Sequence, residues 1–470
     1  MVGAVDYPVG RSDPDYAALD VFVLRQMRKH GLPGVAIAIT RGEKIAYSQG
    51  YGTAGHGARV TPATPMFIGS QSKSFTGIAI AQLAEQGLLD LNAPVRSYVP
   101  WFAIADETAA PNITISHLLH HTSGLSGSRF ATSLDDDASL ETAVRALKTA
   151  RISAPAGERF QYFNFGYVVL AYIVETVSGM RFADYLHEHI LEPLQMTRTY
   201  TDRSIATSAG LSQGYSRLFG FAIPAYQQAP PYQLGTGYMI SSAEDLARFA
   251  IAMNAQGRYQ DASVLSPHWA ERLFAPVGGY GMGWFVGPDR VYHGGSNETF
   301  RTFVELYPGE RIGIVVLVNQ GYILDHYISA EQLIAGVRAF VLDDPVPAVS
   351  AGLSVRVLGW ATLALVVVFM TLSIHSFVRL SDWTDRAAHW SIGRLTWDIA
   401  LNLLVPTGFL IIVVAHLRGF YGDRFDLAHQ LPFMLRNMAD LGILLVVGTV
   451  PDYLQGLTKL CRLRGRKAGG

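Results

Sequence analysis

The feature of the sequence that most constrains the fold is an uncharged apolar stretch near the C-terminal end. Residues 357–378 contain no Asp, Glu, Lys or Arg, and a helix of about 20 apolar residues can cross a lipid bilayer. Before this stretch, residues 343–347 (DDPVP) interrupt the regular patterns, which indicates a linker at residues 345–356. The sequence therefore predicts a water-exposed domain over residues 1–344 and a membrane region over residues 357–470.

Two more candidate membrane spans follow at residues 395–417 and 433–457. The third carries Arg436 and Asp440, and its alternative is a helix that lies in the membrane interface. Basic residues mark the cytoplasmic side of membrane proteins. They crowd the C-terminus of this chain at Lys459, Arg462, Arg464, Arg466 and Lys467. We therefore expect a multi-pass protein of the cell membrane with a cytoplasmic C-terminus and extracytoplasmic residues 1–350.

The N-terminus does not supply the export signal that this topology needs. Residues 1–15 are polar and lack the apolar core of a signal peptide. The expected explanations are a start that lies upstream or a processed form of the protein.

Composition agrees with a membrane region and excludes other classes of function. Charged residues make up only 16% of the chain and the mean hydropathy is +0.20, which is too apolar for a purely soluble protein. A net charge of -1 argues against a nucleic-acid partner. The single Cys461 excludes a disulfide within the chain and a cysteine-based metal cluster.

Strand patterns lie at both ends of the first 340 residues, and helical patterns lie between them. The alternation of apolar residues and the turn signals predict strands at residues 34–40, 44–51, 281–286, 290–293, 302–307 and 312–319. Apolar periodicity predicts helices at residues 15–30, 75–89, 117–121, 140–150, 165–178, 183–191, 242–253 and 328–342. The expected fold class is α+β, with one antiparallel sheet made from both ends and flanked by helices, beside an all-helical subdomain at about residues 90–240.

The pattern Ser70-x-x-Lys73 stands at the start of an apolar helical run. Residues i and i+3 share one face of a helix, so the Ser70 hydroxyl and the Lys73 amine can meet. A serine hydroxyl is a weak nucleophile until a base takes its proton, and a lysine in a dry pocket can lose its own proton and act as that base. Alone, this short pattern is more often a pair of solvated residues.

Two other motifs change that assessment. Tyr162-x-Asn164 precedes a predicted helix, and a phenol and an amide in one loop can relay a proton and hold a carbonyl. His293-Gly294-Gly295-Ser296 ends a predicted strand, where two glycines allow a substrate to approach the backbone.

With these motifs in this order, residues 15–342 resemble the serine penicillin-recognising superfamily, specifically class C β-lactamases, related D-alanyl-D-alanine carboxypeptidases and esterases of the same fold. The resemblance rests on six stretches: FIGSQSKSFTG, LLHHTSGL, FQYFNFGYVVLAYIVETVSG, LGTGYMISSAEDLARF, YGMGW and HGGSNETF. It implies a β-lactamase/transpeptidase-like fold and an acyl-enzyme mechanism that needs no cofactor and no metal.

The resemblance also implies roles for individual residues. Ser70 is expected to be the acylated nucleophile and Lys73 to take or relay its proton. Tyr162 is expected to act as general base in acylation and as acid toward the leaving group, and whether Lys73 or Tyr162 leads stays open. Asn164 is expected to orient Lys73 and the substrate amide. The remaining expected contacts to substrate come from His293, Gly294 and Gly295, with the backbone N–H groups of Ser70 and Ser296 as the oxyanion hole.

Two departures bear on the substrate. His293 stands where many relatives have lysine, and a neutral histidine holds a substrate carboxylate less firmly, which argues against strong β-lactamase activity. Glu298 follows the motif, and it either selects a cationic substrate or is a solvated loop acid, of which the second is the more common. The adjacent His120 and His121 diverge in direction on a helix, so a structural role is expected for both rather than metal binding.

The leading hypothesis is a membrane-anchored extracytoplasmic serine hydrolase that acts on D-alanyl peptides or esters of the cell envelope. Its partners are then a peptide or ester substrate and membrane lipid. The alternatives are a β-lactamase and a penicillin-binding sensor that acylates without turnover, the latter motivated by Asp398, Arg436 and Asp440 in or near the membrane.

Overall fold

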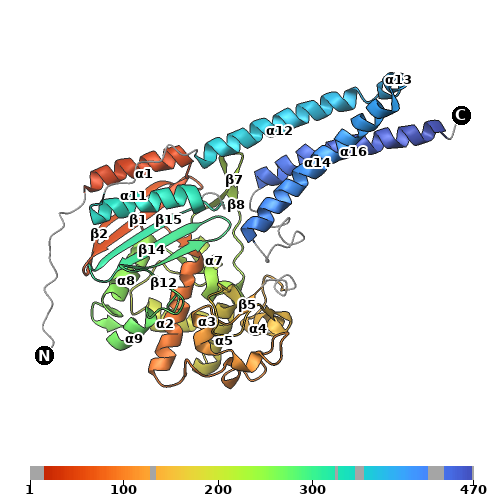
Figure 1. The fold of residues 1–470 in the computed structure, drawn as a ribbon. Coiled ribbons are helices and arrows are strands. Elements are labelled where there is room, and N and C mark those ends of the chain that lie inside the picture. Colours follow the sequence, from red (N-terminus) through yellow and green to blue (C-terminus); the bar gives the residue numbers. More distant parts are fainter. Residues whose placement is uncertain (1–14, 127–133, 323–325, 345–353, 422–438, 468–470) are drawn as a thin grey trace. The chain divides into compact units, whose positions relative to one another are not determined.

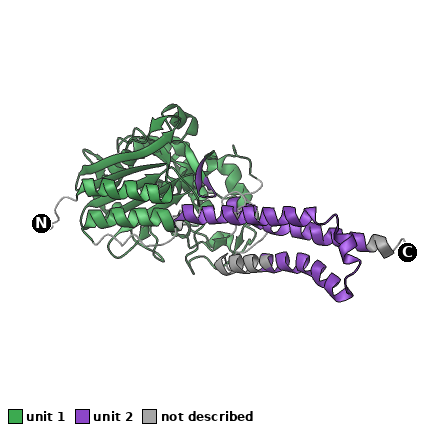
Figure 2. Ribbon diagram, turned by 90° about the horizontal axis from the view of Figure 1, so that it is seen from above, with its two compact units in different colours: residues 1–216, 224–352 green, residues 217–223, 353–470 purple. Residues whose placement is uncertain are grey.

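The computed structural model describes residues 15–126, 134–322, 326–344, 354–421 and 439–467. The chain divides into two compact units, the first made of residues 1–216 and 224–352 and the second of residues 217–223 and 353–470 (Figure 2). Residues 345–353 of the expected linker lie outside the described residues. The division into a sheet-containing unit and a C-terminal helical unit follows the boundary at which the regular patterns of the sequence break.

The first unit contains an antiparallel sheet made from both ends of its sequence. Its described strands follow the order β12-β13-β14-β15-β1-β2-β3. Strand β1 pairs with the late strand β15 in a register that places Val35 opposite Val318, which confirms the predicted sheet. The strands are β1 (Gly34–Arg41), β2 (Lys44–Gly55), β3 (Ala58–Arg59), β12 (Phe285–Val286), β13 (Val291–Ser296), β14 (Arg301–Tyr307) and β15 (Ile312–Val318).

Both faces of this sheet are covered by helices. Helices α1 (Tyr16–His30) and α11 (Glu331–Leu342) lie over one face, and α8 (Ala243–Asn254) lies over the other, with α2 (Ser72–Glu85) below it (Figure 1). The side chains of strand β1 accordingly alternate between the two faces of the sheet. Val35, Ile37 and Ile39 pack with the α1 and α11 side, whereas Ala36 and Ala38 pack with the α8 side. The small side chains let α8 approach the strands closely, and burial on both faces explains why β1 is nearly continuously apolar.

The remaining described helices between the two halves of the sheet are α3 (Ile115–Leu119), α4 (Leu140–Ala146), α5 (Asn164–Ser178), α6 (Phe182–Leu186), α7 (Arg203–Ser208) and, later, α9 (Pro267–Leu273). They include four that overlap predicted helices, α3 to α6, and two, α7 and α9, that were not predicted. Helix α5 ends as expected, since Gly179 takes the left-handed conformation at its C-cap.

Two predictions of secondary structure are wrong in detail. The block at 90–240 is not all-helical, because β5 (Leu125–Ser126) pairs with β6 (Arg151–Ile152) and β7 (Gly214–Leu218) pairs with β8 (Phe221–Ala225). These short pairs carry no long apolar alternation that a sequence could reveal. The strand expected at 281–286 is reduced to its last two residues, since the Gly281 N–H donates to the Trp284 carbonyl and forms a turn instead.

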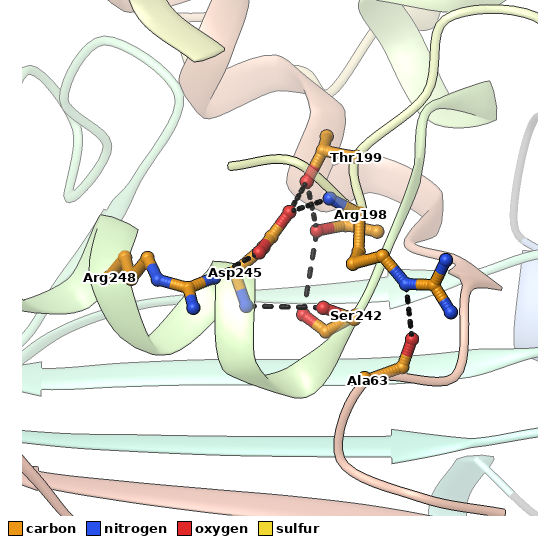
Figure 3. Close-up of polar contacts among 7 residues, drawn as sticks. Ala63, Arg198, Thr199, Ser242, Asp245 and Arg248 are labelled. Atoms are coloured by element: carbon orange, nitrogen blue, oxygen red, sulfur yellow. Dashed lines mark hydrogen bonds and ion pairs between the residues drawn. The ribbon is translucent and has the colours of Figure 1, made fainter. Parts of the chain in front are cut away.

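A buried carboxylate fixes the start of α8 (Figure 3). Asp245 accepts hydrogen bonds from the Arg198 backbone N–H at 2.6 Å and the Thr199 hydroxyl at 2.8 Å, and it forms an ion pair with Arg248. Ser242 caps the helix by accepting the Asp245 N–H at 3.2 Å. Burial raises the pKa of Asp245 above its ordinary 3.8, although these partners oppose the shift. The carboxylate therefore joins α8 to the segment that precedes α7.

The second unit consists largely of helices. They are α12 (Val355–Val378), α13 (Trp383–Ala387), α14 (Ile392–Tyr421) and α16 (Ala439–Lys467). Among the described residues, α12 alone is long and apolar enough to cross a membrane, a criterion of length and composition. The expected span 395–417 lies within α14, and residues 439–457 of the third lie within α16, while Arg436 lies outside the described residues. The multi-pass arrangement stays a prediction.

Candidate active site

The candidate nucleophile Ser70 lies in a tight turn at the entrance to α2. Strand β4 (Met66–Phe67) pairs with β9 (Ile240–Ser241) and leads into a single 3-10 turn at Gly69–Gln71. Gly69 has a φ of 54°, and a Cβ there would lie 2.4 Å from the Ser296 nitrogen. Only glycine fits this close approach. The turn therefore packs directly against the end of β13 and places Ser70 beside Ser296.

Lys73 meets Ser70 as the spacing of the two residues predicts. Its Nζ donates to Ser70 Oγ at 3.2 Å and also to the carbonyl of Thr236. The side chain is fully buried, and within the described residues no carboxylate contacts it. Burial lowers the pKa of Lys73 well below its ordinary 10.5, because an ammonium without a counter-ion is costly in a dry site.

Tyr162 lies on the other side of the nucleophile, in the loop that leads into α5. Its hydroxyl shares a hydrogen bond with Ser70, and burial raises its pKa above the ordinary 10.0. The Lys73 amine lies 4.9 Å from the centroid of the Tyr162 ring. Ser70, Lys73 and Tyr162 therefore form one connected polar group, held between α2 and the loop before α5.

Asn164 does not make the contact to Lys73 that was expected of it within the described residues. It is the first residue of α5 and is exposed, and within the described residues its side chain forms no hydrogen bond with Lys73. The backbone carbonyl of Thr236, in the turn at Leu234–Tyr238, accepts the lysine instead. The structure therefore adds Thr236 to the site, and the expected role of Asn164 stays a prediction.

His293 lies on β13 with both ring nitrogens engaged. Its Nδ1 is 2.8 Å from the Gly294 carbonyl, which can only accept, so this nitrogen carries the proton. Its Nε2 is 2.9 Å from the Tyr280 hydroxyl and accepts from it. Burial, aided by the nearby Lys73, lowers the pKa of His293 to about 3. The residue is therefore a neutral imidazole, which agrees with the expectation that it lacks a permanent positive charge.

The predicted glycines and the oxyanion donors lie at the same edge. A Cβ on Gly295 would lie 1.9 Å from the Ile68 carbonyl oxygen, so this glycine is needed for contact between β13 and the Ser70 turn. Gly294 and Ser296 line a cavity of about 680 Å³ together with Ser70 and Tyr162. The pairing of the Ser70 and Ser296 N–H groups as an oxyanion hole remains a prediction that this proximity favours.

The same cavity extends to a charged cluster on the far side of β13. Arg290, Glu305 and Arg338 line that end. Glu305 is buried, accepts from Arg338 Nε at 2.8 Å and lies 3.7 Å from Arg290 Nη1. The cluster ties α11 to the sheet and gives the cavity a polar far wall.

Glu298 is not free in solvent. Its carboxylate accepts a hydrogen bond from Gln227 and is half-buried. This contact makes it a residue of the loop packing after β13, so the expected solvated acid is replaced by a bonded one.

Metal binding has no support within the described part of the chain, where no group of three or more His, Cys, Asp or Glu is arranged to hold an ion. His120 Nδ1 is instead 2.8 Å from the Tyr280 carbonyl, and His121 packs on Tyr162 with ring centroids 4.2 Å apart. Sequence reasoning missed Thr236, Tyr280 and His121 as members of the site. The signals available were the stretches LGTGYM, YGMGW and LLHHTSGL, whose contacts depend on the tertiary fold.

Comparison with known proteins identifies the family of the chain. A family model described as Beta-lactamase matches residues 19–339. Protein flp of Staphylococcus aureus (strain MW2) is 30% identical over 315 residues, which cover 64% of this chain and 62% of that protein. Unguisins hydrolase ungD' of Aspergillus campestris is 30% identical over 341 residues, covering 66% of this chain and 62% of that protein.

Among solved structures, the octameric penicillin-binding protein homologue from Pyrococcus abyssi matches with a TM-score of 0.62 and 27% identity over 75% of this chain and 81% of that one. The chain thus spans a little under two thirds of the curated relatives' length and most of this structure. Since the family match covers the sheet, its helices and every residue placed around Ser70, this chain belongs to the β-lactamase family of serine hydrolases and penicillin-binding-protein homologues.

Proposed function

We propose that the protein is a serine hydrolase that forms an acyl-enzyme on Ser70, with Lys73 as the base. The observation that carries this proposal is a fully buried lysine, 3.2 Å from a serine hydroxyl, that has no carboxylate partner among the described residues. Its lowered pKa leaves a fraction of neutral amine at neutral pH, and the lone pair of that amine takes the Ser70 proton.

Tyr162 is then the acid of the reaction rather than its first base. A raised pKa keeps the phenol protonated at neutral pH, so it can donate a proton to the leaving group. After departure of that group, the Lys73 ammonium returns a proton to the Tyr162 phenolate. Water then attacks the acyl-enzyme carbonyl and loses a proton to Lys73, and Ser70 Oγ receives a proton from Lys73 as the acyl group leaves. The proposal therefore favours Lys73 over Tyr162 as the base, a choice that the motifs leave open.

The proposed substrates are D-alanyl esters or peptides of the cell envelope, with neutral esters preferred over carboxylate-bearing compounds. The support is His293, which is neutral and already bonded through both nitrogens. A fixed cation would hold a carboxylate strongly, whereas a neutral imidazole does not. For the same reason, β-lactams, which carry a carboxylate, are expected to react more slowly than neutral esters.

The C-terminal unit is proposed to anchor the enzyme to the membrane, with the catalytic unit outside the cytoplasm. The support is the length and apolar character of α12. Asp398, which motivated a sensor, accepts from Lys459 at 2.6 Å and from the Trp383 indole at 3.0 Å. A paired carboxylate of this kind is explained by helix packing, so a plain anchor is favoured over a sensor.

The experiment that tests the proposed function is hydrolysis of a panel by the full chain in detergent. The panel contains p-nitrophenyl esters, a D-Ala-D-Ala peptide and a β-lactam, and labelling with a fluorophosphonate is measured alongside. Ser70→Ala should abolish turnover and labelling, while Ser208→Ala on the exposed surface of α7 should keep both. Turnover by folded Ser70→Ala at the wild-type rate would refute the mechanism.

The same panel separates the alternatives. A sensor would release one equivalent of p-nitrophenol and then stop, whereas a hydrolase releases product continuously. Deletion of residues 346–470 should leave activity on a soluble ester intact if the tail is only an anchor. Loss of activity in a truncated protein that still melts cooperatively would contradict the anchor.

A further inference from the structure

We infer that His121 is the positioning residue for Tyr162, an inference that rests on the proposed function. His121 is buried and lies directly after α3, with a φ of 55°. A non-glycine residue in the left-handed region is uncommon and indicates that the surroundings hold it there. Its ring lies in the aromatic group behind the nucleophile and has no place in the proton transfers themselves.

Three contacts from this one residue surround Tyr162. The His121 carbonyl accepts the N–H of Gln161, the residue before the tyrosine, at 2.6 Å. Its Nδ1 accepts the N–H of Phe163, the residue after the tyrosine, at 3.2 Å. Its ring packs against the Tyr162 ring with centroids 4.2 Å apart. The two peptide neighbours and the phenol are therefore held by a single side chain and its carbonyl.

This role requires a neutral ring. Nδ1 can accept from Phe163 only when it carries no proton, and a charged imidazole would face both Lys73 and His293. These groups surround it together with His120 and the uncharged phenols of Tyr167 and Tyr280. The proton of the neutral ring is then on Nε2, which is buried and has no hydrogen-bond partner within the described residues. A buried N–H without a partner destabilises the folded protein, and a phenylalanine at this position would avoid that cost. The acceptor at Nδ1 is therefore the feature of histidine that this position requires.

His117 offers a matched control on α3, the helix that ends at Leu119 shortly before His121. Its Nδ1 also accepts a backbone N–H, that of Thr114, at the same 3.2 Å. This bond closes the N-terminal cap of α3 and has no contact with Tyr162. The same substitution at the two histidines therefore removes the same kind of bond, in one case at Tyr162 and in the other at a helix cap.

The test is a double-mutant cycle between His121→Phe and Tyr162→Phe, measured as kcat/KM on a neutral p-nitrophenyl ester. His121→Phe keeps an aromatic ring but loses the acceptor, and it should lower kcat/KM about a hundredfold with little change in KM, since a small displacement of a reacting group costs that much. In the Tyr162→Phe background the same change should cost nothing further. His121→Asn restores an acceptor and tolerates the left-handed backbone, so it should recover part of the loss. His117→Phe should lower the melting temperature and leave kcat/KM unchanged.

Additive losses in the double mutant would overturn the inference, because His121 would then act independently of Tyr162. Hydrogen exchange supplies a readout that needs no reaction at all. Exchange of the Gln161 and Phe163 amides should accelerate in His121→Phe and not in His117→Phe, and unchanged exchange in both would also overturn it. If Ser70→Ala keeps the wild-type rate, the proposed function fails, and the exchange measurement still decides whether His121 holds the Tyr162 loop.

Discussion

Lys73 and Asp245 are both buried ionisable residues in the first unit, yet their surroundings differ. Asp245 has a backbone N–H, a hydroxyl and an arginine as partners. Lys73 has a serine hydroxyl and a backbone carbonyl but, within the described chain, no opposite charge. A buried charge with partners holds structure together, whereas a buried amine without a counter-ion is kept ready to lose its proton. The difference separates a site of chemistry from a site of packing without reference to motifs.

The largest expected effect comes from Lys73→Met, which removes the base. We expect kcat/KM on a neutral ester to fall by at least about 10³-fold, or about 4 kcal/mol. The free energy of unfolding should change by less than about 1 kcal/mol, because a buried amine is replaced by an apolar side chain of similar length. Steady-state kinetics and urea unfolding check the two parts. If Lys73→Met kept its activity, or lost it only because the protein unfolded, Lys73 would not differ from Asp245 in the way proposed.

Asp245→Ala should show the opposite pattern. The Arg198 N–H and the Thr199 hydroxyl would lose their acceptor, and we expect a loss of about 3 kcal/mol in the free energy of unfolding. Activity per folded molecule should remain near the wild-type value when measured well below the melting temperature. A fall in kcat with no loss of stability would show that Asp245 acts on the site.

The two residues should also give opposite slopes of stability with pH. The lowered pKa of Lys73 means that the unfolded chain binds more protons between that pKa and 10.5, so this residue makes stability rise with pH over that window. The raised pKa of Asp245 means that the folded chain binds more protons just above 3.8, so stability falls there as pH rises. The free energy of unfolding of each variant, Lys73→Met and Asp245→Asn, is subtracted from that of the wild type at each pH. Each difference should show one slope, of at most about 1.4 kcal/mol per pH unit. Slopes of the same sign for the two residues would contradict the directions of these two pKa shifts.

The smallest effect is expected at an exposed ion pair. Arg181 and Asp184 are 2.6 Å apart, but both side chains are largely in solvent. Asp184→Ala should change the free energy of unfolding by less than about 0.5 kcal/mol and leave kinetics unchanged. A loss as large as that of Asp245→Ala would mean that burial does not distinguish the two carboxylates.

The sequence was sufficient for the parts of the fold and site that depend on local spacing. Ser70 and Lys73 meet because they are three residues apart at a helix entrance, and the paired strands β1 and β15 follow from apolar runs at the two ends of the domain. Tyr162 and His293 were found through motifs whose order along the chain is characteristic.

The parts that were missed depend on packing between distant segments. Thr236 reaches Lys73 across 163 residues of sequence, and Tyr280, which precedes the stretch predicted as a strand at 281–286, reaches His293. Asn164 shows the converse, since its motif position alone did not produce the expected hydrogen bond to Lys73 among the described residues. Neither kind of contact leaves a periodic signal in the sequence.

The most direct test of the account is the pH dependence of Ser70 labelling by a fluorophosphonate under single-turnover conditions. If Lys73 is the base and its pKa is lowered by burial, the rate constant should rise with pH through one ionisation well below 10.5 and then reach a plateau. Lys73→Met should be slow and lack this ionisation. A wild-type rate that keeps rising up to pH 10.5, or a Lys73→Met profile equal to that of the wild type, would contradict the claim that a neutral lysine activates Ser70.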